Sequence, residues 1–180
     1  MKNIPIYRVV LSDDADGITK MSFVKYPAVD INWIALSKED ENQTLMLFDN
    51  DKHIVTSVAL RANYPIYRRD SKGEYYTIFT RENIEKIVQR FFRDNKINSV
   101  NLEHSLNVYG CYLIESYFAK ADNEFGVAEG SWICSYKVDN PQVWSDIKNK
   151  KINGFSIEGF FTFEEYDELE EEINKILNSY

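Results

Sequence analysis

Few side chains of this sequence could carry out a reaction, and one serine and one histidine stand out among them. His104 lies in Asn101-Leu-Glu-His-Ser105, where a predicted strand gives way to a loop that would both hold and expose an imidazole. Ser156 lies in Asn153-Gly-Phe-Ser-Ile-Glu-Gly159, a predicted strand whose flanking glycines would let another chain approach the hydroxyl. A serine nucleophile needs a base to take its proton, and the pKa of histidine suits that role near neutrality. The two residues are thus of the types that a serine–histidine dyad needs.

A structural role for the same residues stays open on these grounds, with Ser156 packed in a strand and His104 bonded to a backbone carbonyl. The pattern Gly154-x-Ser156-x-x-Gly159 differs from the G-x-S-x-G nucleophile elbow. The residues after Ser156 also have the pattern of a strand rather than a helix. An α/β-hydrolase is therefore disfavoured.

Other reactive groups have weaker patterns. Cys111 or Cys134 with His104 would make a thiol hydrolase, but both cysteines lie in apolar strand patterns and are predicted to be inert core thiols. His53 lies beside a predicted hairpin turn, where we expect it to be solvated. With only two histidines and no close cysteine partner, the sequence predicts no metal site and no cofactor.

The bulk composition excludes several classes of protein. The chain has 180 residues, is 44% hydrophobic and has a formal net charge of -8. This charge argues against nucleic-acid or anionic-membrane partners, and no run is apolar enough to span a membrane. Arg68 and Arg69, beside two tyrosines, are therefore expected to contact an acidic surface of the same chain or of another subunit. Trp132 and Trp144 are expected to be core anchors.

The hydrophobic periodicity predicts a mostly β chain with two or three helices. Strands are expected at Pro5–Leu11, Thr19–Val24, Asn32–Leu36, Leu45–Phe48, His53–Leu60, Tyr75–Phe79, Val100–His104, Cys111–Ala119, Trp132–Val138 and Phe155–Phe163. Helices are expected after the caps Thr80 and Asn140, the second with Pro141 in its first turn. These elements predict one α+β domain over residues 1–163.

Residues 164–180 have a different composition. Seven acidic residues against one lysine give 7 − 1 = 6 net negative charges, while apolar residues keep helical spacing. This pattern predicts an acidic amphipathic C-terminal helix that docks on its own sheet or on a partner.

Several stretches, in order, resemble the phage head-maturation (prohead) serine proteases, specifically the XkdF-like domain. They are Ser22-Phe-Val-Lys-Tyr-Pro-Ala-Val29, Trp33-Ile-Ala-Leu36, Ala59-Leu60, Pro65-Ile-Tyr-Arg-Arg-Asp70, Glu74-Tyr-Tyr76, Asn101-Leu-Glu-His104, Tyr112-Leu-Ile-Glu-Ser116, Glu129-Gly-Ser-Trp132, Lys137-Val-Asp-Asn-Pro-Gln-Val-Trp144 and Gly154-Phe-Ser-Ile-Glu-Gly159. The resemblance covers roughly residues 20 to 162. The segments around His104 and Ser156 are its most diagnostic parts.

This resemblance implies a fold similar to the herpesvirus assemblins, with a mostly antiparallel, β-barrel-like core and surrounding helices. It also implies a serine endopeptidase that cleaves phage scaffold, major capsid protein and its own chain inside the assembling procapsid, in the cytoplasm of a bacterial host. Ser156 would then be the nucleophile and His104 the general base. The acidic C-terminal helix is the candidate surface for a homo-oligomer or for a tether to the scaffold. The alternative is a non-catalytic head-assembly protein of the same fold that binds scaffold or capsid subunits.

The third catalytic residue is the open point. Assemblins use a second histidine, but His53 precedes His104 in this chain, so an acid would have to orient the base. We expect Glu115, on the strand after His104, although a tight hairpin pairing His104 with Cys111 would leave it about 13 Å away. Glu158, which shares a strand face with Ser156, is the alternative. Glu103 would point away from the site in a regular strand.

Overall fold

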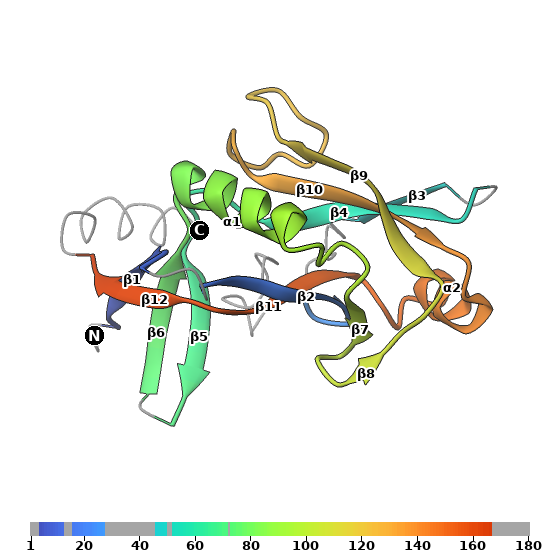
Figure 1. Cartoon of the computed structure of the whole chain (residues 1–180), viewed down its shortest axis with the longest axis horizontal. Helices are drawn as coiled ribbons and strands as arrows, with labels where there is room; N and C mark the ends of the chain where they lie inside the picture. Colours follow the sequence, from blue (N-terminus) through green and yellow to red (C-terminus); the bar gives the residue numbers. More distant parts are fainter. Residues whose placement is uncertain (1–3, 13–15, 28–45, 50–51, 72, 167–180) are drawn as a thin grey trace, which may run out of the picture.

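The computed structural model describes residues 4–12, 16–27, 46–49, 52–71 and 73–166. Within these residues the strands form three four-stranded sheets (Figure 1). The first has the order β12 (Thr162–Glu165), β1 (Ile6–Val10), β6 (Gly73–Ile78), β5 (Ile66–Asp70). The second has the order β3 (Met46–Asp49), β4 (Ile54–Leu60), β10 (Trp132–Val138), β9 (Cys111–Phe118). The third has the order β11 (Gly154–Phe160), β2 (Gly17–Val24), β7 (Val100–Leu102), β8 (Leu106–Asn107).

Both predicted helices begin at the predicted caps. Thr80 Oγ1 accepts the Asn83 N–H at the start of α1 (Arg81–Arg93). Asn140 Oδ1 accepts the N–H groups of Gln142 and Val143 at the start of α2 (Pro141–Lys148). Each cap satisfies backbone donors that the first helical turn leaves unpaired, which explains why the helices begin there.

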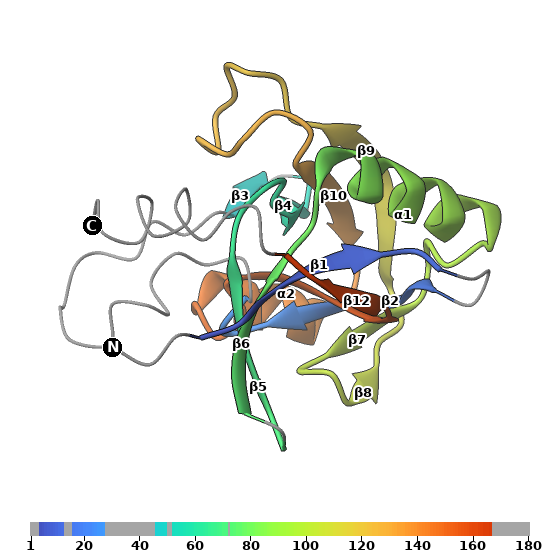
Figure 2. The ribbon, with the colours of Figure 1, turned by 90° about the vertical axis from the view of Figure 1, so that its left-hand side faces the viewer.

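Aromatic side chains join two of the sheets and α1 into one core. Phe23 of β2 contacts Tyr136 of β10 and Phe155 of β11, with ring centroids 5.4 and 5.0 Å apart. Phe91 of α1 meets Trp132 of β10 at 5.4 Å. The helix therefore packs between the β2 sheet and the β10 sheet, as Figures 1 and 2 show from two directions. All five rings are at most 1% exposed.

The predicted α+β class is confirmed, and the barrel-like core is wrong. In the described part of the chain there are two helices, and every strand pair except β1–β6 and β2–β7 is antiparallel. The three sheets are open, because each ends in strands that have a neighbour on one side only. The β2 and β10 sheets bury their apolar faces by packing on one another and on α1, so closure into a barrel is not needed to form the core.

Most predicted strands are found, and the differences lie around the candidate site. β5 was not predicted, and Asn32–Leu36 lies outside the described residues. The His104 segment and the Cys111 strand do not form a hairpin with one another, because β7 pairs with the two-residue β8 while β9 joins β10.

The single strand predicted over Phe155–Phe163 is two strands, β11 and β12, in different sheets. A register shift between Glu158 and Gly159 bends the chain before Phe161. Glu164 and Glu165 then extend β12 instead of starting a helix, since Glu164 forms an ion pair with Arg8 of β1 at 3.0 Å. Residues 167–180, the rest of the predicted C-terminal helix, lie outside the described residues. No helix in the described ranges is long and apolar enough to cross a bilayer.

Candidate active site

Three polar side chains form a row across the β11–β2–β7 sheet. Ser156 is in register with Ser22, and Ser22 is in register with Asn101. Because side chains alternate between the faces of a strand, the row lies opposite the face that carries Phe23 and Phe155. All three row residues are at most 6% exposed. One face of this sheet therefore packs in the apolar core, and the other face carries the row of buried polar side chains.

His104 reaches this row from the turn between β7 and β8. Glu103 and His104 have φ angles of 48° and 55°, and the Ser105 N–H donates to the Leu102 carbonyl at 2.9 Å. Positive φ at both central residues is the feature of primed hairpin turns, which glycine and asparagine usually occupy. The Glu103 carboxylate stabilises the turn by accepting the Lys25 N–H at 2.6 Å. The His104 side chain remains 44% exposed.

The hydrogen bonds around the imidazole define which ring nitrogen carries the proton. Glu158 Oε1 lies 3.1 Å from His104 Nδ1, and an ionised carboxylate can only accept, so Nδ1 carries the proton. Ser22 Oγ lies 3.0 Å from the same nitrogen, and its hydroxyl hydrogen points to the side-chain oxygens of Asn101 at 2.5 Å and Glu158 at 3.1 Å. A neutral imidazole that donates through Nδ1 keeps its lone pair on Nε2, the form needed in a general base.

Glu158 is held as a carboxylate by these neighbours. Burial alone would raise its pKa, but hydrogen bonds from Asn101, Ser22 and His104 outweigh it and hold the pKa below the ordinary value. The Asn101 amide donates to Glu158 Oε1 at 2.5 Å. The acid is therefore ionised at neutral pH and is positioned to stabilise an imidazolium at His104.

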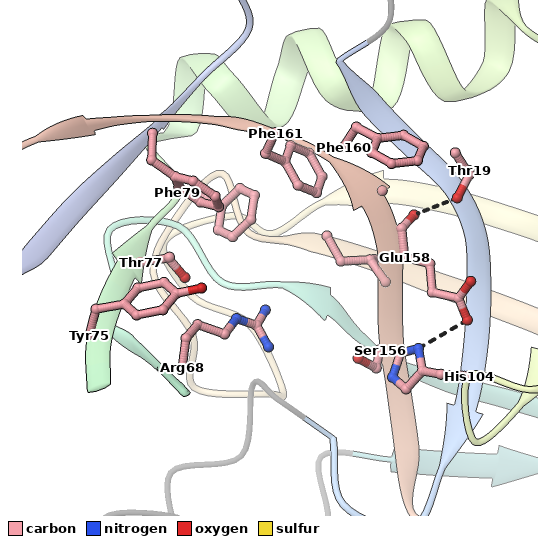
Figure 3. A pocket seen from close by; sticks show the side chains of 13 residues that line it. Thr19, Arg68, Tyr75, Thr77, Phe79, His104, Ser156, Glu158, Phe160 and Phe161 are labelled. Atoms are coloured by element: carbon pink, nitrogen blue, oxygen red, sulfur yellow. Dashed lines mark hydrogen bonds and ion pairs between the residues drawn. The ribbon is translucent and has the colours of Figure 1, made fainter. Parts of the chain in front are cut away.

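Ser156 lies on the other side of the imidazole. In Figure 3 the Nε2 edge of His104 faces Ser156, while the Nδ1 edge carries the bond to Glu158. No hydrogen bond between Ser156 and His104 is present in this described part of the structure, and both residues line one pocket. Side chains directly opposite on neighbouring strands have Cβ atoms about 5 Å apart, so Ser22, bonded to His104, also brings Ser156 close to it. The arrangement gives a hydroxyl, a ring nitrogen with a free lone pair and an orienting carboxylate, in that order.

The pocket is an open hollow of about 410 Å³ between two sheets. Its floor is the segment from Ser156 to Phe161, where the chain passes from β11 towards β12. Its far wall comes from the other sheet and includes Arg68 of β5 and Tyr75 of β6. Within the described residues, no group of three His, Cys, Asp or Glu side chains is arranged to hold a metal ion.

The structure does not bring Glu115 to His104. Glu115 lies on β9 in another sheet, and its Oε2 accepts a hydrogen bond from Ser135 Oγ at 2.7 Å. β9 pairs with β10 and not with the His104 segment, so Glu115 lies in a different sheet from His104. Glu158, the alternative, makes the contact instead.

The remaining candidates lie away from the site. Cys111 and Cys134 are buried, and burial raises the pKa of Cys111 to about 12 and that of Cys134 well above its ordinary value, so neither is a thiolate near neutrality. His53 stacks on Trp144 with ring centroids 4.6 Å apart and is half-buried, contrary to the expected solvated position. Trp132 and Trp144 are buried, as predicted.

Three residues of the site were not predicted: Ser22, Asn101 and Arg68. Ser22 and Asn101 both stand at the centre of apolar strand patterns, where a buried polar group needs a partner. The sequence therefore indicates that these two polar residues have partners, but it does not identify the residues on neighbouring strands that they contact. Arg68 lies on the strand that the sequence reading missed.

A comparison with known families identifies the family of the chain. Residues 41–165 match the family described as "Putative phage serine protease XkdF", and the chain belongs to this family. The matched range contains His104, Ser156 and Glu158 but not Ser22. No curated protein and no solved structure matches the chain.

Proposed function

We propose that this protein is a serine endopeptidase with Ser156 as nucleophile, His104 as general base and Glu158 as the acid that orients His104. The observation that carries the proposal is the orientation of the His104 imidazole. Its Nδ1 is fixed by Glu158 and Ser22, and its Nε2 faces Ser156 in an open pocket. Membership of a phage protease family supports the same class of reaction.

In the proposed reaction His104 Nε2 takes the Ser156 hydroxyl proton as Oγ attacks the peptide carbonyl carbon. The imidazolium then gives this proton to the leaving amine, which releases the first product and leaves an ester on Ser156. Water, deprotonated by the same nitrogen, attacks the ester, and the proton returns to Ser156 as the second product leaves. Glu158 stabilises the imidazolium in both steps.

Ser22 is the other serine near His104, but it is a poor nucleophile. Its side chain is fully buried, and its hydroxyl is engaged by Asn101. Ser22 also contacts Nδ1, the nitrogen on the Glu158 side. We assign it to the positioning of His104 and Glu158.

The proposed substrates are the scaffold and major capsid proteins of the same phage, and the chain itself, within the assembling procapsid. Confinement there would raise the local substrate concentration, so that a modest intrinsic rate suffices. A self-associated form is compatible with this setting.

The test is co-expression of the chain with the scaffold and major capsid proteins of its phage. We expect the wild type to shorten them and Ser156→Ala to leave them intact, while Ser145→Ala, a change in α2, which supplies no residue to the pocket, retains processing. Equal products from the wild type and Ser156→Ala would reject the protease. Stable copurification without cleavage would instead support the non-catalytic head-assembly protein.

A further inference from the structure

Arg68 occupies the pocket wall that faces the candidate catalytic residues. It lies on β5, in register with Tyr75 of β6. In Figure 3 its guanidinium points into the pocket, towards the side where Ser156 and His104 lie. Its neighbour Arg69 is exposed, as strand alternation requires.

The guanidinium of Arg68 has no countercharge within the described residues. It makes neither a hydrogen bond nor an ion pair there, and the carboxylate that shares the pocket, Glu158, is bonded to His104, Ser22 and Asn101. Burial lowers the pKa of Arg68, with a smaller opposing effect of Tyr75. Removing a charge from water without a partner is unfavourable, and a bound carboxylate would supply both the charge and two parallel hydrogen bonds.

The walls around the guanidinium fit the rest of an acidic side chain. Tyr75, Phe79, Phe161 and Phe163 line the same hollow. These rings offer apolar surface to the methylene groups of a bound residue while Arg68 meets its charged end. Among the described pocket residues the one acid is Glu158, and it is bonded to His104 and Asn101. A basic side chain of a substrate would therefore meet the positive charge of Arg68 without a carboxylate to offset it.

We infer that Arg68 is a specificity residue that binds the side-chain carboxylate of a glutamate or aspartate next to the cleaved bond. This inference rests on the proposed peptidase function and names its substrate class. A basic residue or a glutamine at the same substrate position would leave the guanidinium unpaired and would be cleaved more slowly.

An alternative role for Arg68 is stabilisation of the oxyanion formed at the attacked carbonyl. That role would be independent of the substrate side chain. Arg68→Gln would then slow the cleavage of all peptides alike. A specificity role predicts a loss confined to acidic substrates, so the two roles separate on one set of measurements.

The experiment profiles cleavage of a peptide library with amidated C-termini, in which the only carboxylates are side chains. Wild type, Arg68→Gln, Arg69→Gln and Ser156→Ala are compared by mass spectrometry of the products, followed by rates on matched peptides that carry Glu or Gln at the selected position. Arg69→Gln removes the same charge from the opposite face of β5. A second arm measures which library peptides each protein retains without cleavage.

For the wild type and Arg69→Gln we expect acidic residues enriched beside the cut and Glu peptides cleaved at least about tenfold faster than Gln peptides, the size of a charge-assisted hydrogen bond. Arg68→Gln should abolish this ratio and keep the rate on Gln peptides. If the wild type cleaves without a preference for acidic residues, or if Arg68→Gln slows the cleavage of Glu and Gln peptides equally, the inference about Arg68 is rejected and the protease function is not. If none of the proteins cleaves a peptide, the binding arm decides. Retention of acidic peptides by the wild type but not by Arg68→Gln would support the carboxylate-binding site and reject the protease. Equal retention by both, or none, would reject both proposals.

Discussion

At the scale of single residues, the candidate site depends on one tautomer. The Glu158 carboxylate, which can only accept, lies 3.1 Å from His104 Nδ1, and so the proton is on Nδ1 and the lone pair on Nε2. Buried polar side chains thereby determine the chemistry of a ring that is itself partly exposed. Removing an acceptor from this network should therefore affect catalysis more than folding.

Glu158→Gln should lower the rate of peptide cleavage by about 10⁴-fold, the effect expected when an orienting acid becomes an amide that can favour the wrong tautomer. Glu115→Gln is the matched control, because Glu115 is bonded to Ser135 in another sheet. Its rate should stay within a few-fold of the wild type. Initial rates on one peptide measure both, and similar rates for the two variants would remove Glu158 from the mechanism.

The lowered pKa of Glu158 also predicts a pH-dependent stability difference. A carboxyl whose folded pKa is depressed contributes stability above its unfolded pKa and loses it as the pH falls through the folded value. The advantage of the wild type over Glu158→Gln in unfolding free energy should therefore shrink as the pH falls below the ordinary value of 4.5. Urea unfolding at pH 5, 4.5, 4 and 3.5 measures this difference. A gap that stays constant or widens over this range would contradict the assignment.

At the scale of elements, the site depends on local features that interrupt regular strands. A tight turn holds His104, and a register shift in β11 follows Glu158. The strand pattern of the sequence was sufficient to place Ser156 and Glu158 on one face, and that face is the one that carries the site. It could not reveal the turn, because Glu103-His104 is not one of the Asn-Gly, Asp-Gly or Gly-Gly pairs that mark a primed hairpin turn in a sequence. Nor could it reveal that β9 pairs elsewhere, since pairing depends on partners distant in sequence.

Gly159→Ala tests the register shift directly. A methyl group at this position would collide with the backbone carbonyl of Gly17 in β2 and with Phe161. We expect a loss of about 1–3 kcal/mol in unfolding free energy, as for other overpacked sites, together with slower peptide cleavage because Glu158 is displaced. Urea unfolding and initial rates measure the two effects. Wild-type values for both would show that the bend does not position Glu158.

At the scale of the whole molecule, the pocket forms where the chain passes from one sheet to another. β11 belongs to the sheet that carries the polar row, and β12 belongs to the sheet that contains Arg68 and Tyr75. The segment between them supplies the pocket floor. The aromatic contacts of Phe23, Phe91, Trp132, Tyr136 and Phe155 join the neighbouring sheet and α1 to the same core.

A common core predicts one cooperative unfolding transition. In a Trp33→Phe background, fluorescence reports on Trp132 and Trp144, while far-UV circular dichroism reports on all sheets and helices. The two signals should change at the same urea concentration. A separation of the two curves would mean that the sheets unfold independently.

The central claim is that Ser156 is the nucleophile activated by His104. The most direct measurement is labelling of the folded protein with a fluorophosphonate, followed by mass spectrometry of the modified peptide. Wild type and Ser145→Ala should carry one adduct, located on Ser156, while Ser156→Ala and His104→Ala remain unlabelled. An adduct on Ser22 or another residue, or none on the wild type under conditions that label a known serine protease, would contradict the account.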